Sequence, residues 1–406
     1  MNRSPTKLAG GVRTGTDAIL DSGDWIEQLA GSRVAVLAHG ASVTRDFVHL
    51  VDALLERNVR PVRLFGPEHG LRGEAQDMIP VTSEVDAMTG LPCVSLYGHD
   101  EDSLTPRPEQ LEDIDVLLID LQDVGSRYYT YMYTAMLAAQ AATAAGARTV
   151  VLDRPNPIGT AREGGSVHPG FESFVGMLPL PNRHGLTLAQ VLEYARLAGR
   201  TIDFEAIPVQ GASGGESAVD PFLSGAPWVM PSPNMPTRDT ALVYPGLCLL
   251  EGTNLSEGRG TTRPFELFGA PWMDAVQVGR SLHEMELPGV RFRVAGFEPG
   301  FQKWAGHRCR GLQLHVTDPE VFRPVLTGLA IVWTCRRLHP DDFAWRSEAY
   351  EFVADRPAID LLFGQDQTRG LIDDEADFDV VRDSLLSPVP NARLEEASRF
   401  LYGIAS

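Results

Sequence analysis

Cysteine is scarce in this sequence, and the few cysteines are widely spaced. The 406 residues contain four of them, Cys93, Cys248, Cys309 and Cys335, and no two form a Cys-x-x-Cys pair. Zinc ribbons, redox motifs and disulfide frameworks depend on closely spaced cysteines, so this spacing argues against all three. We expect four small core residues in a protein of a reducing compartment.

Long apolar segments are also missing. No stretch of the sequence is long and apolar enough to span a bilayer. Residues 1–11 include two basic side chains, but no apolar segment follows them, as a secretory signal would require. We therefore expect a cytoplasmic protein that does not use a membrane as a partner.

Positive charge is the third shortage. Lys and Arg number 35 against 54 Asp and Glu, which gives a formal net charge of −19 at pH 7. Such a surface repels the phosphates of nucleic acids, so we expect no nucleic-acid partner. Hydrophobic residues at 43% and charged residues at 22% are ordinary for a globular protein, and the length suffices for two domains. The sequence carries no signal for an oligomeric state.

Short apolar runs alternate with helical stretches in the first half of the chain. Continuous apolar strands separated by helices are typical of a parallel sheet that is covered on both faces. We therefore predict the α/β class with a Rossmann-like sheet. No Gly-x-Gly-x-x-Gly follows the first run, so we expect neither a dinucleotide nor another cofactor. The runs are 34–37, 62–65, 93–97, 116–119 and 150–152, and the helical stretches are 47–57, 129–145 and 188–198.

The second half has the pattern of a smaller α/β unit. Residues 290–294 and 312–316 alternate like half-exposed strands, 321–338 have the spacing of an amphipathic helix, and the acidic tail looks helical. A loop rich in Gly, Ser and Pro at 209–230 indicates a boundary soon after it. The predicted division is an N-terminal extension at 1–29, a catalytic Rossmann-like domain at 30–240 and a C-terminal α/β domain at 241–406.

Polar residues gather where the predicted strands end. Gly-Pro-Glu-His-Gly at 66–70 follows the second run, a polar segment at 120–128 follows the fourth, and Asp-Arg-Pro-Asn-Pro at 153–157 follows the fifth. Ligands of parallel α/β sheets bind in the crevice at the carboxyl ends of the strands. The three turns are therefore expected to converge on one site.

Glu68 is the first catalytic candidate. Its turn begins with Pro67, which restricts the backbone, and ends with Gly70, which permits unusual dihedral angles. A Glu beside a His at a strand end can be a general acid, a nucleophile or a metal ligand. A helix cap or a salt bridge is the structural alternative. His69 is as readily an orienting neighbour as a direct participant.

Asp120 and Asp123 are candidates for the second carboxylate that glycoside hydrolysis normally uses. The alternative is turn chemistry, because Asp after a strand readily accepts hydrogen bonds from its own backbone. Asp153 and Asn156, in a turn bracketed by prolines, are candidates for substrate binding, again with turn chemistry as the alternative.

The segment 251–266 is dense in glycine and in hydrogen-bonding groups. Such a loop is suited to grip the hydroxyls and carboxylates of a sugar, although a solvated linker has a similar composition. We favour binding, and the candidate residues are Asn254, Glu257, Arg259 and Thr261.

Two further patterns are weaker. Gly211-Ala212-Ser213-Gly214-Gly215 matches the Gly-x-Ser-x-Gly of a nucleophile elbow, but more loop follows it where a helix should begin. His168 and His184 could be recruited by a metal, yet the sequence has no His-Glu-x-x-His and no close histidine pair. We expect neither an esterase nor a metal site.

Seven segments together resemble the NamZ (YbbC-like) family of exo-β-N-acetylmuramidases. The likeness runs from about residue 30 nearly to the end of the chain and is most specific up to residue 272. The segments are GPEHGLRGE at 66–74, SLYG at 95–98, DLQDVGSRYYTY at 120–131, VLDRPNPIG at 151–159, PNRHGLT at 181–187, PSPNMPT at 231–237 and LLEGTNLSEGRGTTRPFELFGAPW at 249–272.

The resemblance implies an active cleft between the two domains. It also implies release of terminal, non-reducing N-acetylmuramic acid (MurNAc) from β-1,4-linked peptidoglycan disaccharides or muropeptides, such as MurNAc-GlcNAc, as in cell-wall recycling. The family's Glu in GPEHG aligns with Glu68, and the turn His-Gly-Ala-Ser at 39–42 departs from the Asn-Gln-Thr-Gly type that is usual in relatives.

The lactyl carboxylate of MurNAc needs a cation in this acidic protein, and guanidinium binds carboxylates through two hydrogen bonds. Other polar side chains of the quoted segments are candidates for the remaining substrate contacts. We therefore expect binding by Arg72, Arg127, Arg183 and Arg259, and by Gln122, Tyr128, His184 and Asn234.

Two other functions stay open at this point. A metal-dependent hydrolase would use Glu68, His69, Asp120 and Asp123 as ligands. A non-catalytic protein would bind cell-wall sugars without turnover. The second catalytic group is also open among Asp120, Asp123, Glu257 and the 2-acetamido oxygen of the substrate itself.

Overall fold

The main sheet of the protein has seven strands in the order β3-β4-β2-β1-β5-β6-β7. The computed structural model describes residues 12–73, 84–98, 100–211, 228–387 and 391–402. All strands except β3 are parallel, and their order, counted along the chain, is the 3-2-1-4-5-6 of a doubly wound fold. The predicted α/β class with a parallel sheet is confirmed. The strands are β1 (Val34–Ala38), β2 (Arg63–Gly66), β3 (Glu84–Val85), β4 (Pro92–Ser95), β5 (Val116–Asp120), β6 (Arg148–Leu152) and β7 (Glu205–Ile207).

Helices cover both faces of this sheet because alternate side chains of its strands point in opposite directions. In β1, Ala35 and Leu37 belong to one core, whereas Val34 and Val36 belong to another on the opposite face. The first core lies under α4 (Tyr131–Ala145) and α5 (Leu188–Leu197), and the second lies under α1 (Gly15–Leu20), α2 (Gly23–Ala30) and α3 (Leu50–Glu56).

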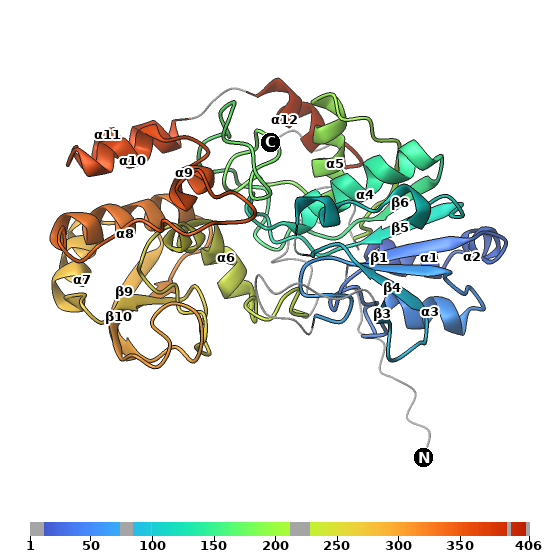
Figure 1. Cartoon of the computed structure of the whole chain (residues 1–406), viewed down its shortest axis with the longest axis horizontal. Helices are drawn as coiled ribbons and strands as arrows, with labels where there is room; N and C mark the ends of the chain where they lie inside the picture. Colours follow the sequence, from blue (N-terminus) through green and yellow to red (C-terminus); the bar gives the residue numbers. More distant parts are fainter. Residues whose placement is uncertain (1–11, 74–83, 99, 212–227, 388–390, 403–406) are drawn as a thin grey trace, which may run out of the picture.

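The second sheet has three antiparallel strands in the order β8-β10-β9. Figure 1 shows the two sheets on opposite sides of the molecule, with α6 between them. The strands and the long helix predicted for this half are confirmed, together with the helical tail. The elements are α6 (Arg238–Leu247), β8 (Leu267–Ala270), α7 (Ala275–Glu284), β9 (Val290–Phe297), β10 (Cys309–Val316), α8 (Pro324–Leu338), α9 (Ala358–Phe363), α10 (Gln367–Asp373), α11 (Phe378–Leu386) and α12 (Ala392–Ser398).

Both ends of the described chain pack on the first sheet. The hydroxyl of Thr16 in α1 donates to Asp120 at the end of β5 (2.6 Å). Helix α12 returns to α5, as Figure 1 shows, and the hydroxyl of Tyr402 donates to Asp153 after β6 (2.6 Å). The sheet is therefore fastened by segments that the sequence assigns to an N-terminal extension and to the second domain.

The cysteines and the helices agree with the composition. All four cysteines are unpaired, and burial raises the pKa of the Cys335 thiol to about 12. No helix among the described residues has both the length and the apolar character that a membrane crossing needs. Residues 212–215 of the Gly-x-Ser-x-Gly match lie outside the described residues.

Candidate active site

Glu68 comes directly after β2 and lines a buried pocket. Its side chain is almost fully buried, and its Oε2 atom accepts a hydrogen bond from the hydroxyl of Thr130 (3.2 Å). The hydroxyl of Tyr131 lies 3.1 Å from the carbonyl oxygen of Glu68 and 2.9 Å from that of Pro231. The next residue, His69, has a φ of +70°, an unusual value for a non-glycine residue. The start of α4 and the 231–235 loop thus hold the Glu68 turn in place.

The opposite wall of the pocket comes from the second half of the chain. The space measures about 420 Å³ and opens to solvent. It contains three carboxylates, those of Glu68, Glu251 and Glu351, from three separate segments. Its described lining consists of Glu68, His69, Tyr128, Tyr129, Thr130, Val175, Ser232, Asn234, Met235, Tyr244, Glu251, Arg259, Phe265, Tyr350 and Glu351.

A charged network fixes the far wall of the pocket. Both Nε and Nη2 of Arg259 donate to one oxygen of Glu251 (3.2 and 2.7 Å), and the hydroxyl of Tyr350 donates to the other (2.7 Å). Burial alone would raise the pKa of Glu251, but the charge of Arg259 and these hydrogen bonds outweigh it and lower the pKa. Glu251 is therefore an ionised carboxylate that orients Arg259.

Asn234 brings an unsatisfied amide to the pocket. Its side chain is 6% exposed, and its Nδ2 atom has no hydrogen-bond partner among the described residues. An unpaired buried donor costs about 1–3 kcal/mol, so proteins keep one where a ligand completes it. The Asn234 amide is therefore suited to donate a hydrogen bond to an oxygen of a substrate.

His39, in the turn after β1, connects the segment that contains Gln122 to the 231–235 loop, which carries Asn234. Its Nε2 atom accepts a hydrogen bond from the backbone N–H of Gln122 (2.8 Å), so Nδ1 carries the proton and donates to the carbonyl of Pro231 (3.1 Å). Burial lowers the pKa of His39 to about 3, and the ring is neutral. The turn after β1 is thus a structural bridge to the 231–235 loop.

Asp120 and Asp123 are not part of the described pocket lining. Asp120 is fully buried, accepts from Arg154 at both oxygens (2.5 and 2.9 Å) and also accepts from Thr16. Asp123 accepts from the backbone N–H of Gly125 (2.7 Å) and lies 3.1 Å from Nε2 of His184. Both carboxylates are thus engaged by protein groups, and Asp123 makes the local turn hydrogen bond that was the alternative interpretation.

Three of the four candidate arginines have protein partners elsewhere. Arg72 forms ion pairs with Asp52 (3.3 Å) and Asp86 (3.0 Å). Arg127 is buried and donates to the carbonyls of Gly165, Leu180 and Leu362, and Arg183 donates to the carbonyl of Ile158. Arg259 is the candidate arginine that lines the pocket.

Among the other polar candidates, some line the pocket or a neighbouring hollow, and the rest form hydrogen bonds elsewhere in the protein. Tyr128 lines the pocket, although its hydroxyl also donates to the carbonyl of Pro245 (3.2 Å). Asn254 and Glu257 line a neighbouring hollow. The remaining side chains form local bonds: Gln122 to the carbonyls of Asp123 and Pro155, Asp153 to the N–H of Ala189, Asn156 to the carbonyl of Leu186, His184 to the N–H of Leu186, and Thr261 to the carbonyl of Gly258.

Several lining residues were missed by the sequence analysis. Tyr129 and Thr130 follow Tyr128 in a segment already singled out, and Glu251 opens the polar loop, so proximity in sequence could have indicated them. Tyr350 and Glu351 carry no such signal, because they lie in an unremarked stretch of the C-terminal half.

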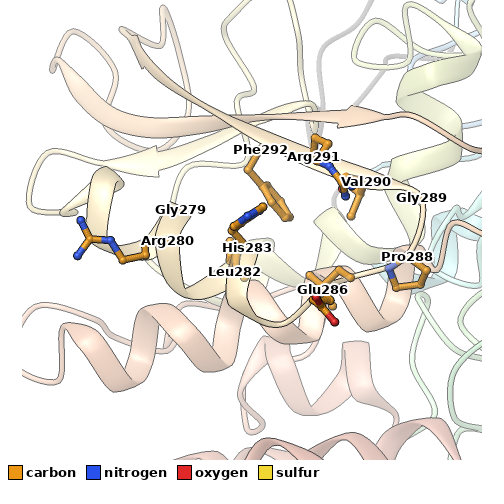
Figure 2. Close-up of a pocket in the computed structure, with 11 residues that line it drawn as sticks. Gly279, Arg280, Leu282, His283, Glu286, Pro288, Gly289, Val290, Arg291 and Phe292 are labelled. Atoms are coloured by element: carbon orange, nitrogen blue, oxygen red, sulfur yellow. The ribbon is translucent and has the colours of Figure 1, made fainter.

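Within the described ranges, no group of three or more His, Cys, Asp and Glu side chains could hold a metal ion. Figure 2 shows a separate hollow, formed by residues 279–292 between α7 and β9; it shares no lining residue with the Glu68 pocket. The fold and the pocket together define an α/β protein with a buried carboxylate cleft, a class to which glycoside hydrolases belong.

Comparison with known proteins narrows this class. The family models described as exo-β-N-acetylmuramidase NamZ, N-terminal and C-terminal, match residues 34–239 and 242–402. The chain is 43% identical over 339 residues, or 83% of its length and 80% of the relative's, to the peptidoglycan β-N-acetylmuramidase NamZ of Bacillus subtilis (strain 168). The chain belongs to the NamZ family of exo-β-N-acetylmuramidases.

Solved structures agree with the family assignment. One protein of the DUF1343 family from Bacteroides fragilis NCTC 9343 superposes with a TM-score of 0.82 at 30% identity, covering 96% of this chain and 99% of that one. A second from the same organism gives a TM-score of 0.69 at 27% identity, covering 92% and 94%. The resemblance inferred from seven sequence segments is confirmed over almost the whole chain.

Proposed function

We propose that this glycosidase releases terminal, non-reducing MurNAc from β-1,4-linked peptidoglycan fragments, with Glu68 as its principal catalytic carboxylate. The observation that carries the proposal is the burial of Glu68 in a pocket whose walls come from both halves of the chain. Membership of the NamZ family supports the substrate class. In this role Glu68, which is almost fully buried, passes a proton to the leaving oxygen as a general acid.

We propose that two pocket residues recognise the features that distinguish MurNAc. Arg259 binds the lactyl carboxylate, because it lines the pocket and Glu251 holds its guanidinium in place. Asn234 donates its unsatisfied amide to an oxygen of the 2-acetamido group. His69 orients Glu68.

Glu351 is our proposal for the second carboxylate, in place of Asp120, Asp123 and Glu257. Glu351 lines the same pocket as Glu68 but comes from a distant segment of the chain. Its Oε2 atom accepts a hydrogen bond from the hydroxyl of Tyr97 (3.2 Å). Glu251, the third carboxylate, is committed to Arg259 and Tyr350. Glu351 is therefore the better placed group to assist water or the oxocarbenium-like centre.

The test of Glu68 is its replacement by an uncharged isostere. Glu68→Gln removes the transferable proton, so kcat for MurNAc-GlcNAc should fall by a factor of about 100 or more while thermal unfolding is unchanged. Glu266→Gln is the matched control: Glu266 is equally buried, bonds to Thr240 and Arg263, and lines no described part of the pocket. Substantial turnover by Glu68→Gln, measured as MurNAc released, would end the assignment.

We also propose a domain boundary and a cellular compartment. The boundary lies near residue 240, with segments before it and segments after it both supplying walls of the pocket. The enzyme recycles wall fragments in the cytoplasm, for which four unpaired cysteines are the supporting observation, since thiols persist in reducing compartments.

A further inference from the structure

A second hollow adjoins the Glu68 pocket. It measures about 1320 Å³, and its lining includes Asn254, Lys303, Trp304, Trp345 and Arg346. It shares Glu251 and Arg259 with the Glu68 pocket, so the ion pair of these two residues is the common wall. We call it the tryptophan hollow.

Two indole rings are fixed in this hollow by their N–H groups. Trp304 Nε1 donates to the carbonyl of Asn254 (2.6 Å), and Trp345 Nε1 donates to the carboxylate of Asp373 (2.9 Å). Both side chains are only half-buried, although tryptophan is a large apolar residue. Since their polar atoms are engaged by the protein, what they offer to a ligand in the hollow is a flat apolar face.

The backbone is shaped to place one of these rings. Gln302 and Trp304 have φ values of +65° and +62°, a region that bulky residues rarely adopt. Lys303 between them anchors the segment, because its ammonium donates to the carbonyls of Leu250 (2.8 Å) and Thr253 (3.1 Å). Strained positions of this kind gather at ligand sites.

Asn254 joins the two rings into one structure. Besides accepting from Trp304, its side-chain amide donates to the carbonyl of Asp342 (2.8 Å) and accepts from the N–H of Ala344 (3.1 Å), which precedes Trp345. The sequence indicated Asn254 as a substrate contact. The structure makes it the residue that positions the aromatic walls of the hollow.

The charged residues of the hollow are balanced, with Glu251, Glu257 and Glu348 against Arg259, Lys303 and Arg346, so its lining as a whole does not select a charged ligand. Arg259 is paired with Glu251 (2.7 Å) and Lys303 with Glu257 (2.7 Å). A stem peptide with free carboxylates would meet acidic groups as well as these paired cations. A pyranose ring has an apolar C–H face and neutral hydroxyls, which suit an indole face bordered by paired charges.

We propose that the tryptophan hollow binds the GlcNAc residue that follows the cleaved bond, with its ring against Trp304. The inference rests on the proposed function. An exo-acting enzyme holds the terminal sugar in the smaller pocket beside Glu68, so the rest of the glycan must extend past the shared wall into the larger space.

The test separates the two sugar sites kinetically. In Trp304→Leu, which keeps an apolar side chain without a ring, KM for MurNAc-GlcNAc should rise about tenfold, the equivalent of 1.4 kcal/mol. The inhibition constant of free MurNAc should not change, because MurNAc alone occupies the Glu68 pocket. Trp25→Ala, at a tryptophan of α2 that packs under Arg148, is the matched control and should leave both constants unchanged.

A second measurement follows the binding of the GlcNAc unit directly, without turnover. Methyl β-GlcNAc added to the Glu68→Gln variant should shift its tryptophan fluorescence, and the shift should shrink in Glu68→Gln combined with Trp304→Leu. If the wild type cleaves MurNAc-GlcNAc and Trp304→Leu has an unchanged KM, the role of the hollow is overturned but the proposed function is not. An effect confined to peptide-bearing substrates would also overturn that role, whereas no MurNAc release by the wild type would overturn the proposed function itself.

Discussion

At the scale of single residues, Asn234 should favour substrate binding but lower the stability of the folded protein. Its buried amide nitrogen has no partner among the described residues, and an unsatisfied donor costs about 1–3 kcal/mol. Asn234→Leu, of similar volume, should therefore leave thermal stability equal or higher while kcat/KM for MurNAc-GlcNAc falls about tenfold or more. Paired unfolding and kinetic measurements check both directions. A variant that is destabilised and fully active would show that the amide serves the fold.

His39 makes a prediction about pH. Its pKa is lowered by burial to about 3 from an ordinary value near 6.5, so between these values the unfolded chain binds a proton that the folded chain does not. Stability must then fall as the pH drops through this window, by about 2 kcal/mol at pH 5 from this group. His39→Gln keeps one acceptor for Gln122 and one donor for Pro231 but cannot titrate.

The measurement is denaturant unfolding of both proteins from pH 7 to pH 4. The stability of His39→Gln should decline less steeply than that of the wild type between pH 6.5 and pH 4. Parallel curves for the two proteins would show that His39 does not titrate in this way. His49, whose pKa is also lowered by burial, is present in both and cancels from the comparison.

Residue patterns predicted the right kind of chemistry but only part of the pocket. Glu68 was recognised because a proline and a glycine bracket its turn, and the structure places it in the pocket. Asp120 and Asp123 have the same position after a strand, but Arg154 and His184 engage them. Their partners come from distant turns, and sequence spacing does not reveal such pairs.

At the scale of elements, the short turn that carries Glu351 is the least expected part of the site. Tyr350 and Val353 pair through two backbone hydrogen bonds (2.9 and 3.0 Å), and both intervening residues, Glu351 and Phe352, have positive φ. Turns of this shape favour Asn and Gly, so a Glu-Phe pair is strained there. This turn places the carboxylate of Glu351 at the pocket.

The turn yields a prediction about the second carboxylate. Glu351→Gln should lower kcat for MurNAc-GlcNAc by a factor of about 100 or more, because a general base or nucleophile is lost, with KM little changed. Glu375→Gln is the matched control, since Glu375 is an exposed Glu that also has a positive φ (+55°). Equal kcat values for Glu351→Gln and the wild type would contradict the role of Glu351. They would favour the 2-acetamido group of the substrate as the second catalytic group.

Regular elements were the most predictable level of this molecule. Strands β1, β5 and β6 are short, largely buried apolar runs, and Thr187 caps α5 by accepting from the N–H of Gln190, as its place before a helical pattern suggests. The Glu351 turn was not predictable, because its residues contradict the usual turn preferences.

At the scale of the whole molecule, the site exists only where turns and loops of the two halves of the chain meet. Residues separated by almost 300 positions, from Glu68 to Glu351, line one pocket, and the Glu251–Arg259 pair separates it from the tryptophan hollow. The sequence predicted the α/β class and the family, since both depend on local segments. It did not predict which polar turns meet, because that depends on the packing of the two halves.

The most direct test of the account is to incubate the purified protein with MurNAc-GlcNAc and, separately, with GlcNAc-MurNAc, and to resolve the products by mass spectrometry. The account predicts free MurNAc and GlcNAc from the first disaccharide and no cleavage of the second, with or without EDTA. Cleavage of GlcNAc-MurNAc, or of neither disaccharide, would contradict it.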